Sequence, residues 1–118
     1  MSIDEAIKAH VSWKMKLSNY LANPDRSLNA ADISVDNRCD LGRWIHGTGS
    51  GYAALPEFVA LKQKHAHFHR TAGSIVSRAD RGEKVSKEVV FGSGSDFAKA
   101  SSDVVSALMN IKLKIVAT

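Results

Sequence analysis

Three long segments of this chain repeat apolar side chains every three or four residues, the spacing of one face of an α-helix. The segments are residues 2–22, 55–79 and 95–115. None of the chain shows the alternating pattern typical of a β-strand. We therefore expect an all-α fold, an antiparallel four-helix bundle in which a short Cys-bearing helix at 39–45 accompanies the long helices.

Caps and helix breakers set the expected boundaries. Ser2 and Ser95 are suited to cap the first and last long helices, and Pro56 suits the first turn of the middle one. Polar residues 24–38 are expected to form a loop that can hold a helical turn. The glycine-rich stretch 46–51 is expected to hold no helix, because glycine loses the most backbone freedom on folding. A minor helical piece is expected at 84–91.

The composition describes a single domain spanning residues 1–118. With 44% hydrophobic residues the chain can fill a core, and its single cysteine excludes an internal disulfide, as is common in a reducing cytoplasm. No window approaches the roughly 18 apolar residues of a membrane span, and the acidic start does not resemble a signal peptide. We expect a cytoplasmic protein without direct membrane insertion. The net charge of +4 comes from scattered basic residues with few aromatics between them, so we expect no nucleic-acid partner.

Four side chains are candidates for a metal site. His65 and His69 are four residues apart on the middle helix, so both imidazoles project from one face. His10 lies on the apolar face of the first helix, and Cys39 begins the short helix. Burying these groups without partners would cost roughly 1–3 kcal/mol each. A shared metal would use their lone pairs and connect three separate elements.

Each candidate also has a simpler interpretation. A single histidine or cysteine on an inward face is more often a core residue than a ligand, so the hypothesis depends on the four residues together. His67 is two residues from His65, about 200° around the helix axis, and is expected on the surface. His46, in the glycine-rich turn, is also expected on the surface.

The ligand types select the metal and exclude several activities. One thiolate with three imidazoles favours Zn²⁺ over the oxygen-preferring Mg²⁺ and Ca²⁺. Four protein ligands leave no position for a reacting water, and the chain has no motif for a nucleophile or a nucleotide. We therefore expect a zinc protein that is not an enzyme.

The motifs around the four candidates resemble the chemoreceptor zinc-binding (CZB) domain family. They are His10-Val11-Ser12-Trp13, Cys39-Asp40-Leu41-Gly42-Arg43-Trp44 and His65-Ala66-His67-Phe68-His69. The resemblance implies a four-helix, often dimeric, domain with a 3-His/1-Cys zinc core at His10, Cys39, His65 and His69. It implies a place in bacterial signalling, mainly with chemoreceptors or diguanylate cyclases, and sensing of zinc or of oxidants such as hypochlorous acid. At the matching non-ligand positions, we expect Gly42 to permit close helix approach, and Trp13 and Trp44 to wall the site.

Three hypotheses of different class follow. The first is a cytoplasmic sensor domain, expected to be a homodimer as the resemblance implies. Its Cys39 thiolate would be oxidised or released and so change the output of a chemoreceptor, a diguanylate cyclase or another effector. The second is a structural, zinc-stabilised helical dimerisation module. The third is a metal-free helical interaction module. In the first, Asp36 or Asp40 could offset the charge of the zinc site.

Overall fold

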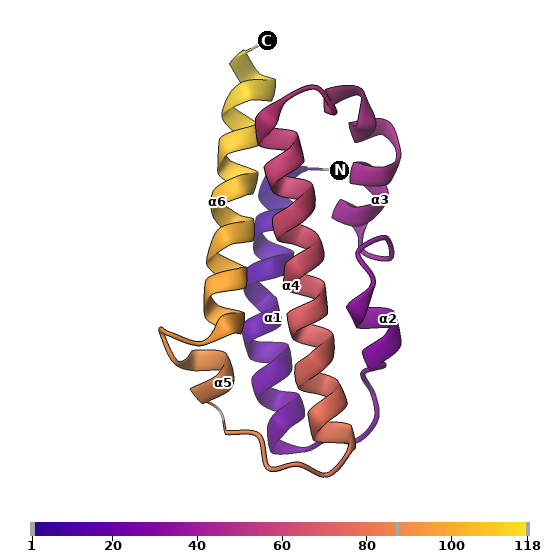
Figure 1. Ribbon diagram of the computed structural model, residues 1–118, viewed down its shortest axis with the longest axis vertical. Helices are drawn as coiled ribbons and strands as arrows, with labels where there is room; N and C mark the ends of the chain where they lie inside the picture. Colours follow the sequence, from indigo (N-terminus) through magenta and orange to yellow (C-terminus); the bar gives the residue numbers. More distant parts are fainter. Residues whose placement is uncertain (1, 87, 118) are drawn as a thin grey trace.

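The computed structural model describes residues 2–86 and 88–117, and this part of the chain contains helices and no strand (Figure 1). Three long helices form its body: α1 (Ile3–Ala22), α4 (Pro56–Asp80) and α6 (Asp96–Ala117). α1 and α4 run in the same direction and α6 runs in the opposite one (Figure 1). The expected all-α helical bundle is confirmed.

The fourth position of the bundle holds a broken helix. α2 (Ala30–Ser34) and α3 (Asp40–His46) follow one another antiparallel to α4, on the side away from α6 (Figure 1). α2 lies so close to α4 that a Cβ on Gly73 would be 1.9 Å from the Ser34 hydroxyl. Between the two short helices, residues 35–39 are irregular. This break is where the cysteine lies.

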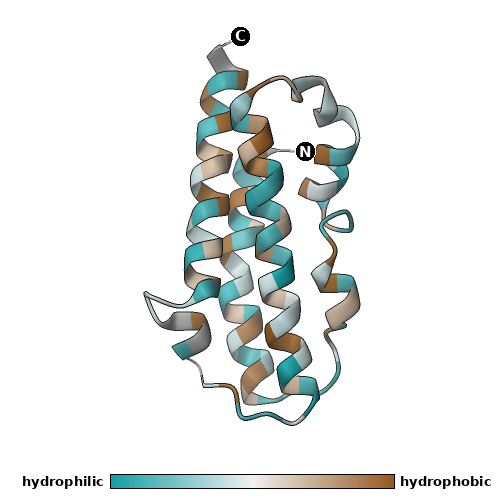
Figure 2. Cartoon of the chain, in the orientation of Figure 1, coloured by the Kyte–Doolittle hydropathy of each residue, from teal (hydrophilic) through white to brown (hydrophobic). Residues whose placement is uncertain are grey.

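The apolar faces of the three long helices meet in one core. Hydrophobic residues recur along each of them between hydrophilic ones (Figure 2). The face expected for α4 is buried as a whole, with each side chain no more than 7% exposed: Phe58, Leu61, His65, Phe68, Ala72, Ile75, Val76 and Ala79. Within the described residues, no helix has the length and apolarity needed to cross a membrane.

The predicted boundaries agree with the structure where a cap defines them. The Ser2 hydroxyl accepts a hydrogen bond from the Glu5 backbone N–H at 3.4 Å, and the Ser95 hydroxyl accepts one from the Ala98 N–H at 3.0 Å. The polar region 24–38 contains α2, which is the helical turn that the loop was expected to allow.

Two local predictions need correction. The glycine-rich stretch does hold a helix, the 3₁₀-helix η1 (Thr48–Tyr52), whose i→i+3 hydrogen bonds need only a few ordered residues. The expected helical piece at 84–91 shortens to α5 (Glu88–Phe91), while residues 83–86 are irregular and residue 87 lies outside the described residues.

Candidate metal centre

The four candidate side chains meet at one point inside the bundle. α1 carries His10, the residue before α3 is Cys39, and α4 carries His65 and His69. Each offers one nitrogen or sulfur atom, and these four atoms all lie within 4.8 Å of one another. The three imidazoles are no more than 3% exposed, and Cys39 is partly buried. Sequence reasoning therefore identified a cluster that the fold assembles from three separate elements.

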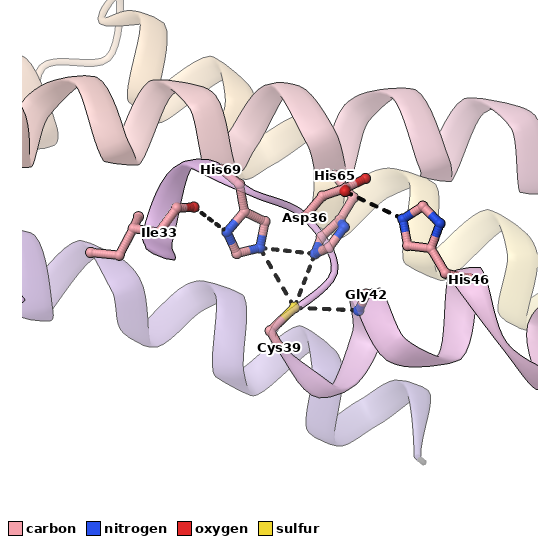
Figure 3. A network of polar contacts seen from close by, with 7 residues as sticks. All are labelled: Ile33, Asp36, Cys39, Gly42, His46, His65 and His69. Atoms are coloured by element: carbon pink, nitrogen blue, oxygen red, sulfur yellow. Dashed lines mark hydrogen bonds and ion pairs between the residues drawn. The ribbon is translucent and has the colours of Figure 1, made fainter. Parts of the chain in front are cut away.

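Backbone carbonyls fix the orientation of two of the imidazoles. Nδ1 of His10 lies 2.8 Å from the Ala6 carbonyl oxygen, and Nδ1 of His69 lies 2.9 Å from that of Ile33 (Figure 3 shows the latter). A carbonyl only accepts, so each Nδ1 carries the proton and each Nε2 keeps a free lone pair. Nε2 of His10 is buried and has no hydrogen-bond partner. Both rings therefore present a bare nitrogen as a metal ligand would.

The spacing of the remaining atoms suits a tetrahedral ion. Nε2 of His65 lies 3.2 Å from the Cys39 sulfur and 2.9 Å from Nε2 of His69, and the sulfur lies 3.5 Å from the latter nitrogen (Figure 3). Usual Zn–N and Zn–S bond lengths give edges of about 3.3 Å between nitrogens and about 3.5 Å between nitrogen and sulfur. The residues present therefore fit a zinc ion after small adjustments.

Burial keeps all four groups neutral when no metal is bound. The pKa of His65 is lowered to about 2, mainly by desolvation and in smaller part by the neighbouring His69 and His10. Desolvation is also the main cause that lowers the pKa values of His10 and His69, although their carbonyl hydrogen bonds oppose it. Desolvation raises the pKa of the Cys39 thiol. Neutral imidazoles can bind a cation, and bound Zn²⁺ would hold the thiol as a thiolate.

A cleft of about 820 Å³ opens between α1 and α3, and two of the four candidates, His10 and Cys39, line it. Trp13 and Trp44 line the same cleft, as expected for residues that wall the site. His65 and His69 are not among its lining residues. The cluster thus has one side open toward solvent, at the sulfur.

The surrounding residues include one correction. A Cβ on Gly42 would lie 1.8 Å from the Asp36 carbonyl oxygen, so this glycine permits close approach of the preceding loop and not of another helix. His67 and His46 are exposed, as expected, but His46 also contacts Asp36, with 3.3 Å between Nε2 and Oδ1. This contact and the carbonyls of Ala6 and Ile33 were missed, because every residue has a carbonyl and sequence does not show where it points.

Comparison with known proteins agrees with the geometry. The sequence profile of the chemoreceptor zinc-binding domain matches residues 10–76, which is more than half of the chain and includes all four candidate ligands. Neither the comparison with curated proteins nor that with solved structures gave a match.

Proposed function

Because the chain belongs to the chemoreceptor zinc-binding domain family, we propose that His10, Cys39, His65 and His69 are the ligands of its zinc ion. The convergence of bare, buried imidazole nitrogens on the cysteine sulfur carries this proposal. Zinc with one thiolate and three neutral imidazoles has a net charge of about +1 and no open coordination position. The domain would accordingly regulate and not catalyse.

Elemental analysis of untagged protein tests the ligand assignment. We expect about one zinc per chain, a much weaker site in Cys39→Ser and His65→Gln, and full zinc content in the control His67→Gln, whose imidazole is exposed. Protein purified without metal and then titrated should take up the same amount. Failure of the parent protein to take up zinc while folded would contradict the proposal.

The regulatory role we propose is that of a sensor for zinc or for an oxidant such as hypochlorous acid. Its support is the position of Cys39, partly buried and lining a cleft. The Cys39 thiolate would attack the chlorine-bearing oxidant, giving a sulfenic acid and releasing chloride, and a sulfenic acid is a weaker metal ligand than a thiolate. The residues around α3 would then change their packing, which an effector could detect.

A structural role is the alternative, in which zinc only stabilises a helical dimerisation module. Exchange separates the two roles: a sensor must release zinc to a competing chelator, or upon one equivalent of hypochlorous acid, within minutes. A structural site would hold zinc through both treatments. Oxidant-driven release that persists in Cys39→Ser would contradict the role given to the thiolate.

The family and one surface of the molecule support a proposal on partners and location. We propose a homodimer that acts with a chemoreceptor, a diguanylate cyclase or another effector in the cytoplasm. Four of the six large hydrophobic side chains exposed within the described residues lie on α1 and α6, in pairs four residues apart: Val11, Met15, Met109 and Leu113. These helices adjoin, since Lys112 pairs with Asp4 at 2.7 Å. We call the outer surface of α1 and α6 that carries these four side chains the α1–α6 face. We propose that a second copy of the chain binds there.

A further inference from the structure

The irregular segment between α2 and α3 contacts α3 at two positions one turn apart, both through Asp36. The Asp36 carbonyl oxygen lies against Gly42, where a Cβ would be 1.8 Å away. The Asp36 carboxylate reaches His46, with 3.3 Å between Oδ1 and Nε2 (Figure 3). Gly42 and His46 are four residues apart and so lie on one face of α3. The loop is thus held against α3 at two positions, in its first turn and at its last residue.

Cys39 lies inside the loop that these two contacts close. It is three residues after Asp36 and three before Gly42, whose backbone N–H donates a hydrogen bond to the Cys39 sulfur at 3.3 Å. The Ile33 carbonyl that orients His69 lies three residues before Asp36, in α2. Any movement of Asp36 away from α3 would therefore move the sulfur relative to the imidazoles of α4.

The contact between Asp36 and His46 is only partly exposed to solvent. The Asp36 side chain is 22% exposed and that of His46 38% exposed, whereas the other described carboxylate–cation pairs have at least one partner that is 40% exposed or more. Fully exposed pairs contribute little to stability because water screens them. This pair lies beside the cluster, and the Asp36 charge acts on His69.

We propose that Asp36 and His46 are positioning residues that hold the Cys39 sulfur against the three imidazoles and so slow its departure from zinc. The inference rests on the proposed zinc ligands. On this inference, two side chains that are not themselves zinc ligands control the rate at which zinc is released. Residues behind metal ligands typically change metal affinity by about 10–100-fold when removed, so a tenfold effect on zinc release is a realistic expectation.

Three variants separate positioning from charge. Asp36→Ala and His46→Ala each remove the contact, while Asp36→Asn keeps a polar group opposite His46 and removes only the charge. If the pair positions the sulfur, both alanine variants should release zinc about tenfold faster than the parent, and the double variant should be no faster than either, because the two residues act as one unit. Asp36→Asn should stay within about threefold of the parent. Asp4→Asn, which weakens the ion pair between α1 and α6, is the matched control and should release zinc at the parental rate.

Two further measurements report on Cys39 itself. In Co²⁺-substituted protein, the thiolate-to-metal charge-transfer band should weaken or shift in both alanine variants and stay unchanged in Asp4→Asn. In metal-free protein, Cys39 should react faster with a small thiol reagent in the alanine variants than in the parent. Metal-free unfolding monitored by circular dichroism shows whether each variant is folded, and the cobalt spectrum tests the geometry even in a variant whose metal-free form is less stable.

The outcomes distinguish this inference from the proposed function. Zinc bound in a Cys39-dependent manner, with parental release rates and parental cobalt spectra in both alanine variants, would overturn the positioning role alone. Equal acceleration in Asp36→Asn and Asp36→Ala, with none in His46→Ala, would also overturn it, because charge would then explain the effect. A parent protein that binds no zinc would instead overturn the ligand assignment on which the inference depends.

Discussion

The buried imidazoles predict how the stability of the metal-free domain depends on pH. His65 is fully buried, and its pKa is lowered to about 2 in the folded protein, compared with about 6.5 in an unfolded chain. Between these values the unfolded chain binds a proton that the folded protein does not. This group's contribution to the free energy of unfolding should therefore be fully present at pH 7.5 and should be lost progressively as the pH falls below about 6.5.

The size of the effect follows from the same numbers. Between pH 7.5 and pH 5, protonation of this imidazole in the unfolded chain costs the folded state about 2 kcal/mol. His10 and His69 are buried with lowered pKa values and add to the loss in the same direction. Even the loss of about 2 kcal/mol from His65 alone is a large part of the roughly 5–15 kcal/mol by which domains are typically stable.

Urea unfolding of metal-free protein at pH 7.5, 6.5, 5.5 and 5.0 measures this loss. His65→Leu removes one buried imidazole and keeps an apolar side chain, so its curve should be flatter than the parent's by about 2 kcal/mol over the range. His67→Gln removes an exposed imidazole and should reproduce the parent's curve. A parental free energy of unfolding that stays constant from pH 7.5 to pH 5, or a slope that His65→Leu does not change, would refute the reasoning.

Three further predictions concern other parts of the molecule. Gly42→Ala places a Cβ against the Asp36 carbonyl and should weaken both zinc binding and stability by more than about 1 kcal/mol. Gly51→Ala, with nothing within 4 Å of its Cβ, should change neither. Zinc titration and urea unfolding of both variants measure this. In the metal-free protein, Cys39 should be modified by a small thiol reagent without unfolding, since it lines the cleft, and mass spectrometry after brief labelling measures this. Leu113→Glu on the α1–α6 face, where Leu113 is 71% exposed, should shift a dimer toward monomer in sedimentation without lowering the zinc content.

Sequence periodicity was sufficient to predict the long helices and the inward direction of three of the proposed ligands. A helical repeat of 3.6 residues determines which side chains share a face, so His10 and His65 could be assigned to the buried faces that they occupy. His69 followed because it lies one turn from His65. The prediction was wrong at 46–51. The low helix propensity of glycine led us to expect no helix there, but hydrogen bonds between near neighbours form a 3₁₀-helix.

The broken fourth helix could not be predicted, because its geometry depends on contacts between distant parts of the chain. The polar residues of 29–37 show no helical periodicity, and several of them make separate local contacts. Asn29 caps α2 by accepting a hydrogen bond from the Asp32 N–H at 3.0 Å, and Asp36 contacts His46. Such contacts can be recognised only when the positions of α2 and α3 beside α4 are known.

This break is also what allows the cluster to form. In an unbroken helix opposite α4, a cysteine's sulfur would be directed by the helical repeat alone. Here Cys39 is the residue that caps α3, with extended backbone angles, and its sulfur accepts the Gly42 N–H while it faces His65 and His69. A residue at the end of a short helix can move without unfolding a long one, because local opening costs less than global unfolding. The bundle therefore combines three proposed ligands on long helices, one on α1 and two on α4, with the fourth, Cys39, at the start of a short helix, an arrangement that suits the reversible zinc or oxidant sensing that we propose.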